Sequence, residues 1–131
     1  MITLTYSDLI NSFADVTTLL GIELKIPSAK KLKQIFIDLR ENIGIYNQLQ
    51  LALVAKYEGK VNEKGTHYEF PEAHHDGAQL ELAELDKQKI NMNGEKFDEN
   101  ELQRYDADQK KYMPVNIPSK ILVSAHYLFN F

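Results

Sequence analysis

The sequence predicts a mainly α-helical fold: a helical hairpin with one long helix over about 28–58, short strands in the middle region, and an apolar C-terminal helix that packs back. Three observations predict it. Apolar residues recur every three or four positions in two segments that precede Glu58. Proline and glycine stand where those segments begin and end. The chain of 131 residues, 44% hydrophobic, is large enough for one domain with its own core.

The first helix is predicted from about Ser7 to Leu20. Thr5 or Ser7 can cap its start, Asp8 suits its positive end, and Gly21 is a natural stop. Its apolar residues recur at spacings of three and four and form one stripe that we expect to be buried: Leu9, Ile10, Phe13, Val16, Leu19 and Leu20.

The second helix is the clearest prediction. Pro27 suits a first helical turn, and the helix should run to Tyr57 or Glu58, before Gly59. Thirty residues would make a rod of about 45 Å. An apolar seam repeats every seven residues along it, at Leu32, Leu39, Tyr46 and Leu53. Gly44 interrupts the helix at a cost near 1 kcal/mol relative to alanine, which indicates a bend or the close approach of another backbone.

Two apolar residues of this helix lie opposite the seam. Ile37 and Leu51 are fourteen residues, or four turns, apart. A helix that is apolar on two sides usually has two neighbours. The second neighbour is either the C-terminal part of this chain or another protein, including a second copy. Ile37 and Leu51 are therefore candidate interaction residues.

The middle region, residues 59–114, is predicted to be a polar, acidic insert. Its first part, to Pro71, is rich in turn residues. We expect four short elements in it: a strand over Thr66–Phe70, a helix over about Glu72–Asp86, a strand over Lys89–Asn93, and a helix capped by Asp98 with Glu101 three residues on.

The last segment, residues 115–131, is densely apolar. Its pattern fits a helix after Pro118 or an alternating strand. The tripeptide Ile117-Pro118-Ser119 repeats Ile26-Pro27-Ser28, where the long helix is predicted to begin, and this repeat favours the helix. Residues 1–131 are thus predicted to be a single domain made of a scaffold (1–58), an insert (59–114) and a C-terminal segment (115–131).

The charge is divided along the chain. Residues 1–60 carry a net +1 and residues 61–131 a net −5, with eleven acids against four bases between Glu72 and Asp108. This balance argues against direct binding of nucleic acid. The acidic excess suits binding to a protein partner with a basic surface, or mimicry of a phosphate backbone. One basic cluster, Lys25, Lys30, Lys31 and Lys33, is expected to be a solvated face. No apolar run is long enough to span a membrane and no export signal is present, so we expect the cytoplasm.

Catalytic motifs are absent from the sequence. Without cysteine there is no thiolate metal site and no cysteine nucleophile. Glycine-rich phosphate loops and glycine-flanked serines are also missing. The one cluster of residue types that bind metals is the segment His67–Asp76, and its spacing matches no known metal motif. His67, His74 and His75 could serve a small metal-dependent enzyme, but a solvated loop is the simpler interpretation. We therefore expect no cofactor and no catalytic residue.

The tyrosines fall into two groups. Tyr46 and Tyr57 lie on the long helix and should pack in the core. Tyr68, Tyr105 and Tyr112 stand among polar residues, without the interleaved lysines and arginines of a platform that stacks nucleic-acid bases. They are candidate anchors for a protein partner, because tyrosine is favoured in interfaces.

Three stretches carry a resemblance to a known group of proteins. They are Leu4–Asn11, the proline-started helix over Ile26–Tyr57, and Ile117-Pro118-Ser119 with the apolar segment that follows. Their order resembles short accessory proteins of tailed phages and prophages of Gram-positive bacteria, whose role is largely unassigned; the segment His67–Asp76 departs from that group. The resemblance implies a small accessory protein in the host cytoplasm or within the virion.

The function expected from these observations is a non-enzymatic protein–protein interaction module, an adaptor or an inhibitor of a host protein. The first alternative is a minor structural or assembly protein of a phage particle, which would self-associate. The second is the metal-dependent enzyme that uses the region His67–His75.

Overall fold

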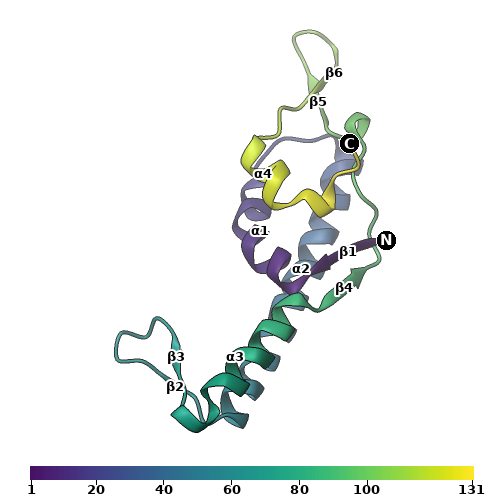
Figure 1. The fold of residues 1–131 in the computed structure, drawn as a ribbon. Coiled ribbons are helices and arrows are strands. Elements are labelled where there is room, and N and C mark those ends of the chain that lie inside the picture. The colour runs from purple at the N-terminus through teal and green to yellow at the C-terminus, as the bar shows by residue number, and fades with distance from the viewer.

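The computed structural model describes all 131 residues, 56% of them helical, so the prediction of a mainly helical fold is confirmed (Figure 1). The elements are, in chain order, β1 (Ile2–Thr5), α1 (Tyr6–Leu19), α2 (Ile26–Lys56), β2 (Lys60–Val61), β3 (Tyr68–Glu69), α3 (Glu72–Lys87), β4 (Lys89–Met92), the 3-10 helix η1 (Glu99–Glu101), β5 (Gln103–Asp106), β6 (Lys111–Pro114), α4 (Ser119–Ser124) and the 3-10 helix η2 (His126–Leu128). None of the helices combines the length and the apolar character that crossing a membrane requires.

The start of α1 is fixed by its cap. The Thr5 hydroxyl accepts a hydrogen bond from the Asp8 N–H, and the Asp8 carboxylate accepts one from the Thr5 N–H, both at 3.0 Å. This reciprocal arrangement satisfies two backbone donors that a helix start otherwise leaves unpaired. The helix therefore begins one residue earlier than the sequence indicated, and it buries Leu9, Val16 and Leu19. Ile10 and Leu20, which were expected in the same buried stripe, are exposed.

The strand β1 is an element that was not predicted from the sequence. It pairs antiparallel with β4, with Ile2 opposite Met92 and Leu4 opposite Ile90. Ile2 and Leu4 point into the core, whereas Thr3 points outward and its hydroxyl donates to the Asn91 side chain at 2.8 Å. The pairing attaches the start of the chain to a segment about ninety residues later.

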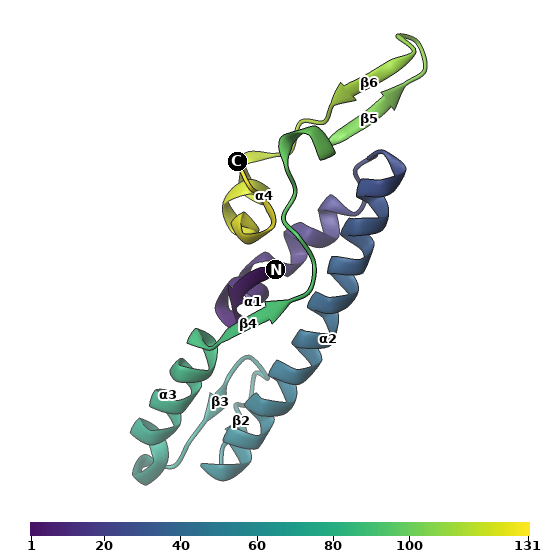
Figure 2. The same ribbon diagram turned by 90° about the vertical axis from the view of Figure 1, so that its right-hand side faces the viewer.

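The long helix α2 belongs to two parts of the molecule (Figures 1 and 2). Its first half packs in the main core through Leu32, Ile35 and Leu39. Tyr46 marks the boundary, because its ring lies 5.3 Å from that of Tyr6 and its hydroxyl donates to Asp86 at 2.7 Å. Beyond it, α2 and α3 run side by side away from the main body and carry the β2–β3 hairpin (Figure 2). We call residues 47–87 the arm.

The arm has only a small interior of its own. Val54 of α2 and Ala78 of α3 are buried but lie outside the main core cluster. At the tip, a Cβ atom placed on Gly59 would stand 2.5 Å from the Phe70 ring and 2.9 Å from Val54. This close approach explains the glycine at the end of α2.

Gly44 was expected to mark a bend or a close backbone approach. The structure corrects the second interpretation: a Cβ atom placed there would meet no atom within 4 Å, and the residue is exposed. The helix continues without interruption from Ile26 to Lys56. Gly44 thus weakens α2 without any packing benefit within the chain.

The C-terminal segment is helical, as the sequence favoured, but in two short pieces, α4 and η2. It packs against α1, and two side-chain hydrogen bonds join them: Ser12 to Tyr127 at 2.6 Å and Ser124 to Asp15 at 2.5 Å. The Phe97 N–H donates to the carbonyl of Leu128 at 2.7 Å.

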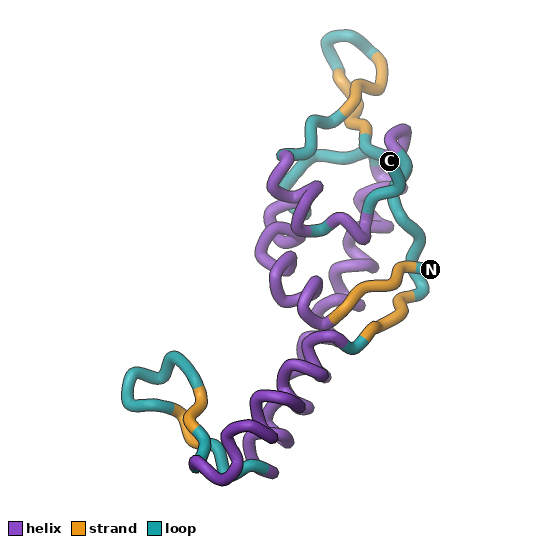
Figure 3. The backbone as a smooth tube through the Cα atoms, viewed as in Figure 1, coloured by secondary structure: helices purple, strands orange, loops and turns teal.

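The middle region also contributes to this core. Leu85, Met92, Phe97 and Leu102 belong to the same buried cluster as the residues of α1 and α2. The tube in Figure 3 shows the β5–β6 hairpin projecting beyond the helices, at the end of the molecule opposite the arm. The region is therefore three pieces: the arm tip with α3, the core-forming segment around β4 and η1, and this hairpin.

Candidate protein-interaction site

The β5–β6 hairpin brings together the two tyrosines that the sequence proposed as anchors. Its register places Tyr105 directly opposite Tyr112. Their rings meet edge to face, with centroids 5.5 Å apart and planes at 70°. Such cross-strand aromatic pairs stabilise a two-stranded sheet by roughly 0.2–1 kcal/mol. Their contact was not predicted, because this hairpin was not identified from the sequence.

The turn of the hairpin explains the pairing. The Asp106 carboxylate accepts hydrogen bonds from the N–H groups of Asp108 and Gln109, at 2.9 and 3.2 Å. Lys110 takes the left-handed conformation, with φ 54°. Asp106-Ala107-Asp108 was a usable sequence signal, because aspartate often starts a turn by accepting backbone N–H bonds.

Both tyrosines remain open to solvent. Tyr105 is 49% exposed and Tyr112 is 56% exposed. The Lys25 ammonium lies 6.0 Å from the centre of the Tyr112 ring. Aromatic rings with a polar tip can bury apolar area and still offer a hydrogen bond, which suits them to protein contacts.

The base of the hairpin is held on the start of α2. The Lys25 N–H donates to the Gln103 carbonyl at 2.7 Å, and its ammonium donates to the Asn100 carbonyl at 2.9 Å. Lys31 forms an ion pair with Glu101 at 2.9 Å. Two members of the basic cluster therefore position the hairpin rather than forming only a solvated face.

Glu101 is ionised at this contact. Burial alone would raise the pKa of the Glu101 carboxyl, but hydrogen bonds from the Asp98 N–H and from Lys31 outweigh burial and lower the pKa. The charge on Glu101 is thus maintained at neutral pH, and with it the ion pair at the base of the hairpin.

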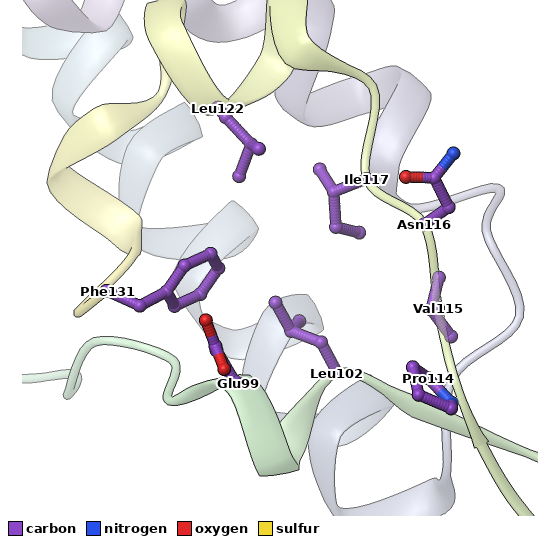
Figure 4. Close-up of a pocket in the computed structure, with 8 residues that line it drawn as sticks. All are labelled: Glu99, Leu102, Pro114, Val115, Asn116, Ile117, Leu122 and Phe131. Atoms are coloured by element: carbon purple, nitrogen blue, oxygen red, sulfur yellow. The ribbon is translucent and has the colours of Figure 1, made fainter.

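An apolar pocket lies beside the hairpin base (Figure 4). Its volume is about 250 Å³. Leu102, Ile117 and Leu122 reach into it from three different segments, while Phe131 stands on one side (Figure 4). The remaining lining residues are Glu99, Pro114, Val115 and Asn116.

The tyrosine pair lies next to the pocket along β6. Pro114, which lines the pocket, is two residues from Tyr112 on β6, so both side chains lie on the same face of the hairpin. Phe131 remains 59% exposed at the pocket side. We call Tyr105, Tyr112 and the pocket residues the hairpin site. The pocket was not predicted, because its lining comes from segments far apart in the sequence, from η1 to the last residue.

The other two candidate residues lie on α2, apart from the hairpin site. Leu51 is 56% exposed, and Ile37 is half-buried. Gly44 lies midway between them, seven residues from each, and is exposed. The structure therefore does not join Ile37 and Leu51 to Tyr105 and Tyr112 in a single surface.

The three histidines of the metal hypothesis do not converge. His67 lies near Glu69 at 4.0 Å, His74 near Glu58 at 3.6 Å, and His75 near its neighbour Asp76 at 3.5 Å. No three His, Asp or Glu side chains come close enough together to hold a metal ion. The geometry gives the metal-dependent enzyme no support.

Many carboxylates of the acidic region have partners within the chain. Glu81 binds Lys56 at 2.9 Å, and Glu95 binds the N-terminal ammonium at 2.9 Å. These contacts lower the pKa of both carboxyls. The acidic region is therefore partly structural, and a smaller set of carboxylates than the composition indicates is free for a partner.

Comparison of the chain with protein-family models, curated proteins and solved structures finds no match.

Proposed function

We propose that this protein is a non-enzymatic protein–protein interaction module that binds its partner through the hairpin site. The observation that carries the proposal is the exposed pair Tyr105 and Tyr112 on a projecting hairpin, with an apolar pocket at the hairpin base. A complete tyrosine side chain buries roughly 150–250 Å². Covering the exposed half of each ring, roughly 100 Å², would contribute about 2.5 kcal/mol apiece at about 25 cal/mol/Å². That is the range of interface hot spots.

The resemblance to phage accessory proteins indicates where such a module would act and which proteins it would bind. The partner would be a host or phage protein, and the module an adaptor or an inhibitor that acts in the host cytoplasm or within the virion. Glu99 at the pocket and the net charge of −4 favour a partner with a basic surface.

The experiment compares two faces of the same hairpin. Three tagged proteins are compared: the wild type, Tyr105→Ala/Tyr112→Ala and Arg104→Ala/Met113→Ala. Each is used to capture proteins from host and infected-cell lysates, and quantitative mass spectrometry identifies the captured proteins. Arg104 and Met113 form the next cross-strand pair and point to the opposite face, so their variant is a matched control. Circular dichroism checks that all three proteins are folded.

We expect proteins enriched by the wild type to be lost with the tyrosine variant and kept with the control. An identical set of captured proteins for the wild type and the tyrosine variant would contradict the proposal.

A role as a minor structural or assembly protein of a phage particle is favoured by a different observation. Leu51 is exposed on α2, with Gly44 and Ile37 at intervals of seven residues along the same side. This stripe could pack against a second copy. The substitutions Ile37→Asp and Leu51→Asp should then convert an oligomer into a folded monomer in size-exclusion chromatography with light scattering. A wild-type protein that is monomeric at all concentrations would rule this role out.

A further inference from the structure

The arm carries a groove between α2 and α3 that is separate from the hairpin site. Its volume is about 360 Å³. Leu49, Ala52 and Leu53 of α2 and Leu85 of α3 give it an apolar floor. Lys56, Glu81, Glu84 and Gln88 form its polar rim.

The apolar floor continues along one side of α2. Ile45, Leu49 and Ala52 follow at spacings of four and three, which places them in one stripe on the helix. Ile45 is 47% exposed and Leu49 is 41% exposed. From Ile45 to Ala52 the stripe is about 10 Å long, enough for two turns of another helix. Exposed apolar stripes beside a groove between two helices are the usual receptor for an amphipathic helix.

The charge of the arm indicates what kind of helix fits. Residues 47–87 contain eight Asp or Glu against four Lys. Lys56 is committed to Glu81 through hydrogen bonds of 2.9 and 3.2 Å, and that contact raises the pKa of Lys56. The exposed Glu84 is therefore the free charge on the rim of the groove.

We propose that the groove between α2 and α3 binds a basic amphipathic helix of a partner protein. Its apolar face lies over Leu49, Ala52 and Leu85, and its lysine or arginine side chains meet Glu84 and the surrounding negative field. A second copy of this chain is the poorer occupant, because its arm brings the same excess of carboxylates and the two arms repel. The groove lies between α2 and α3, shares no lining residue with the hairpin site, and does not depend on it.

The test uses a defined probe. The probe is a fluorescein-labelled peptide of leucine and lysine, long enough for five helical turns, with the leucines on one helical face. The full chain is titrated into it, and binding is followed by fluorescence anisotropy. The matched peptide has glutamate in place of every lysine. The protein variants are Leu49→Glu in the floor of the groove and Leu51→Glu, which makes the same change two residues away on another side of α2.

We expect the lysine peptide to bind and Leu49→Glu to weaken it by about tenfold or more, the effect of losing about 1.4 kcal/mol. Leu51→Glu should change the dissociation constant less than about twofold. The glutamate peptide should not bind. Because Leu49→Glu could disturb the arm, the exposed variant Glu84→Lys provides a second measurement: it should weaken binding at low salt and lose that effect at high salt.

Three outcomes overturn the proposal. One is equal weakening by Leu49→Glu and Leu51→Glu. Another is equal binding of the two peptides, or no binding. The third is a concentration-dependent dimer in light scattering that Leu49→Glu makes monomeric, which would assign the groove to a second copy. The variant Tyr105→Ala/Tyr112→Ala should bind the peptide like the wild type. A negative result for the groove can therefore be distinguished from a negative result for the hairpin site.

Discussion

The hydrogen bond between Ser12 and Tyr127 allows a sharp test of how the C-terminal segment is held. Both residues are almost fully buried, at 0% and 2% exposure, and their hydroxyl oxygens are 2.6 Å apart. Ser12→Ala leaves the Tyr127 hydroxyl buried without a partner, which should cost about 1–3 kcal/mol of unfolding free energy. Tyr127→Phe leaves Ser12 its second contact, the Leu9 carbonyl at 3.4 Å, so we expect a smaller loss of about 1 kcal/mol.

The double variant is the decisive measurement. With both hydroxyls removed, no buried oxygen is left unpaired, and the loss should be close to that of Tyr127→Phe alone. Urea unfolding followed by circular dichroism gives the unfolding free energies of the wild type, the two single variants and the double variant. If the losses of the single variants simply add in the double variant, the hydrogen bond does not couple α1 to η2 and the reasoning is wrong.

The same pair predicts a dependence on alkaline pH. Burial, opposed by the hydrogen bond with Ser12, raises the pKa of Tyr127 to about 12 from the ordinary 10. The folded state therefore favours the protonated phenol. This stabilisation is complete below pH 10 and is lost as the pH rises from 10 to 12, by up to about 3 kcal/mol. The variant Tyr127→Phe should lose less stability than the wild type over this interval.

Three further predictions follow from backbone and packing. Gly44→Ala should stabilise the protein by about 1 kcal/mol, because the new methyl group meets open space on a helix, and a lower melting temperature in calorimetry would contradict this. Gly59→Ala should destabilise by about 1–3 kcal/mol in urea unfolding, since its Cβ atom would overlap the Phe70 ring, and unchanged stability would refute that contact. Amide protons of α3 should exchange faster than those of α1 in hydrogen-exchange NMR, because the arm has little buried core; equal protection would contradict this.

The helices were predicted well where local signals agree with burial. Thr5 and Asp8 cap α1, and Pro27 lies in the first turn of α2. The apolar spacing matches the buried faces in part, because Ile10 and Leu20 of the expected stripe are exposed. The structure begins α3 at Glu72, as expected, and it also places a cap at Asp98 with Glu101, although the short helix there is a 3-10 turn. Helix caps and apolar spacing depend on residues within about four positions of each other, so they can be predicted from a single sequence.

The strand β1 and the hairpin site depend on distant partners. Ile2-Thr3-Leu4-Thr5 alternates over only four residues, and its partner β4 lies about ninety residues away, so nothing local identifies the pairing. Residue type alone indicates Tyr105 and Tyr112 as candidate anchors, but their contact comes from the register of β5 and β6. The pocket at the hairpin base needs the chain to bring Leu102 and Phe131 together, which no periodicity encodes.

The separation between Ser12 and Tyr127 has a consequence for the order of folding. The contact joins residues 115 positions apart, so the main core cannot close until Tyr127 has left the ribosome. The helices α2 and α3, in contrast, are near neighbours in sequence and can meet while synthesis continues. Contacts between close residues form faster than contacts between distant ones. The nascent chain should therefore present the arm first and complete the main body last, with α1 and the first half of α2 exposing apolar surface until η2 arrives.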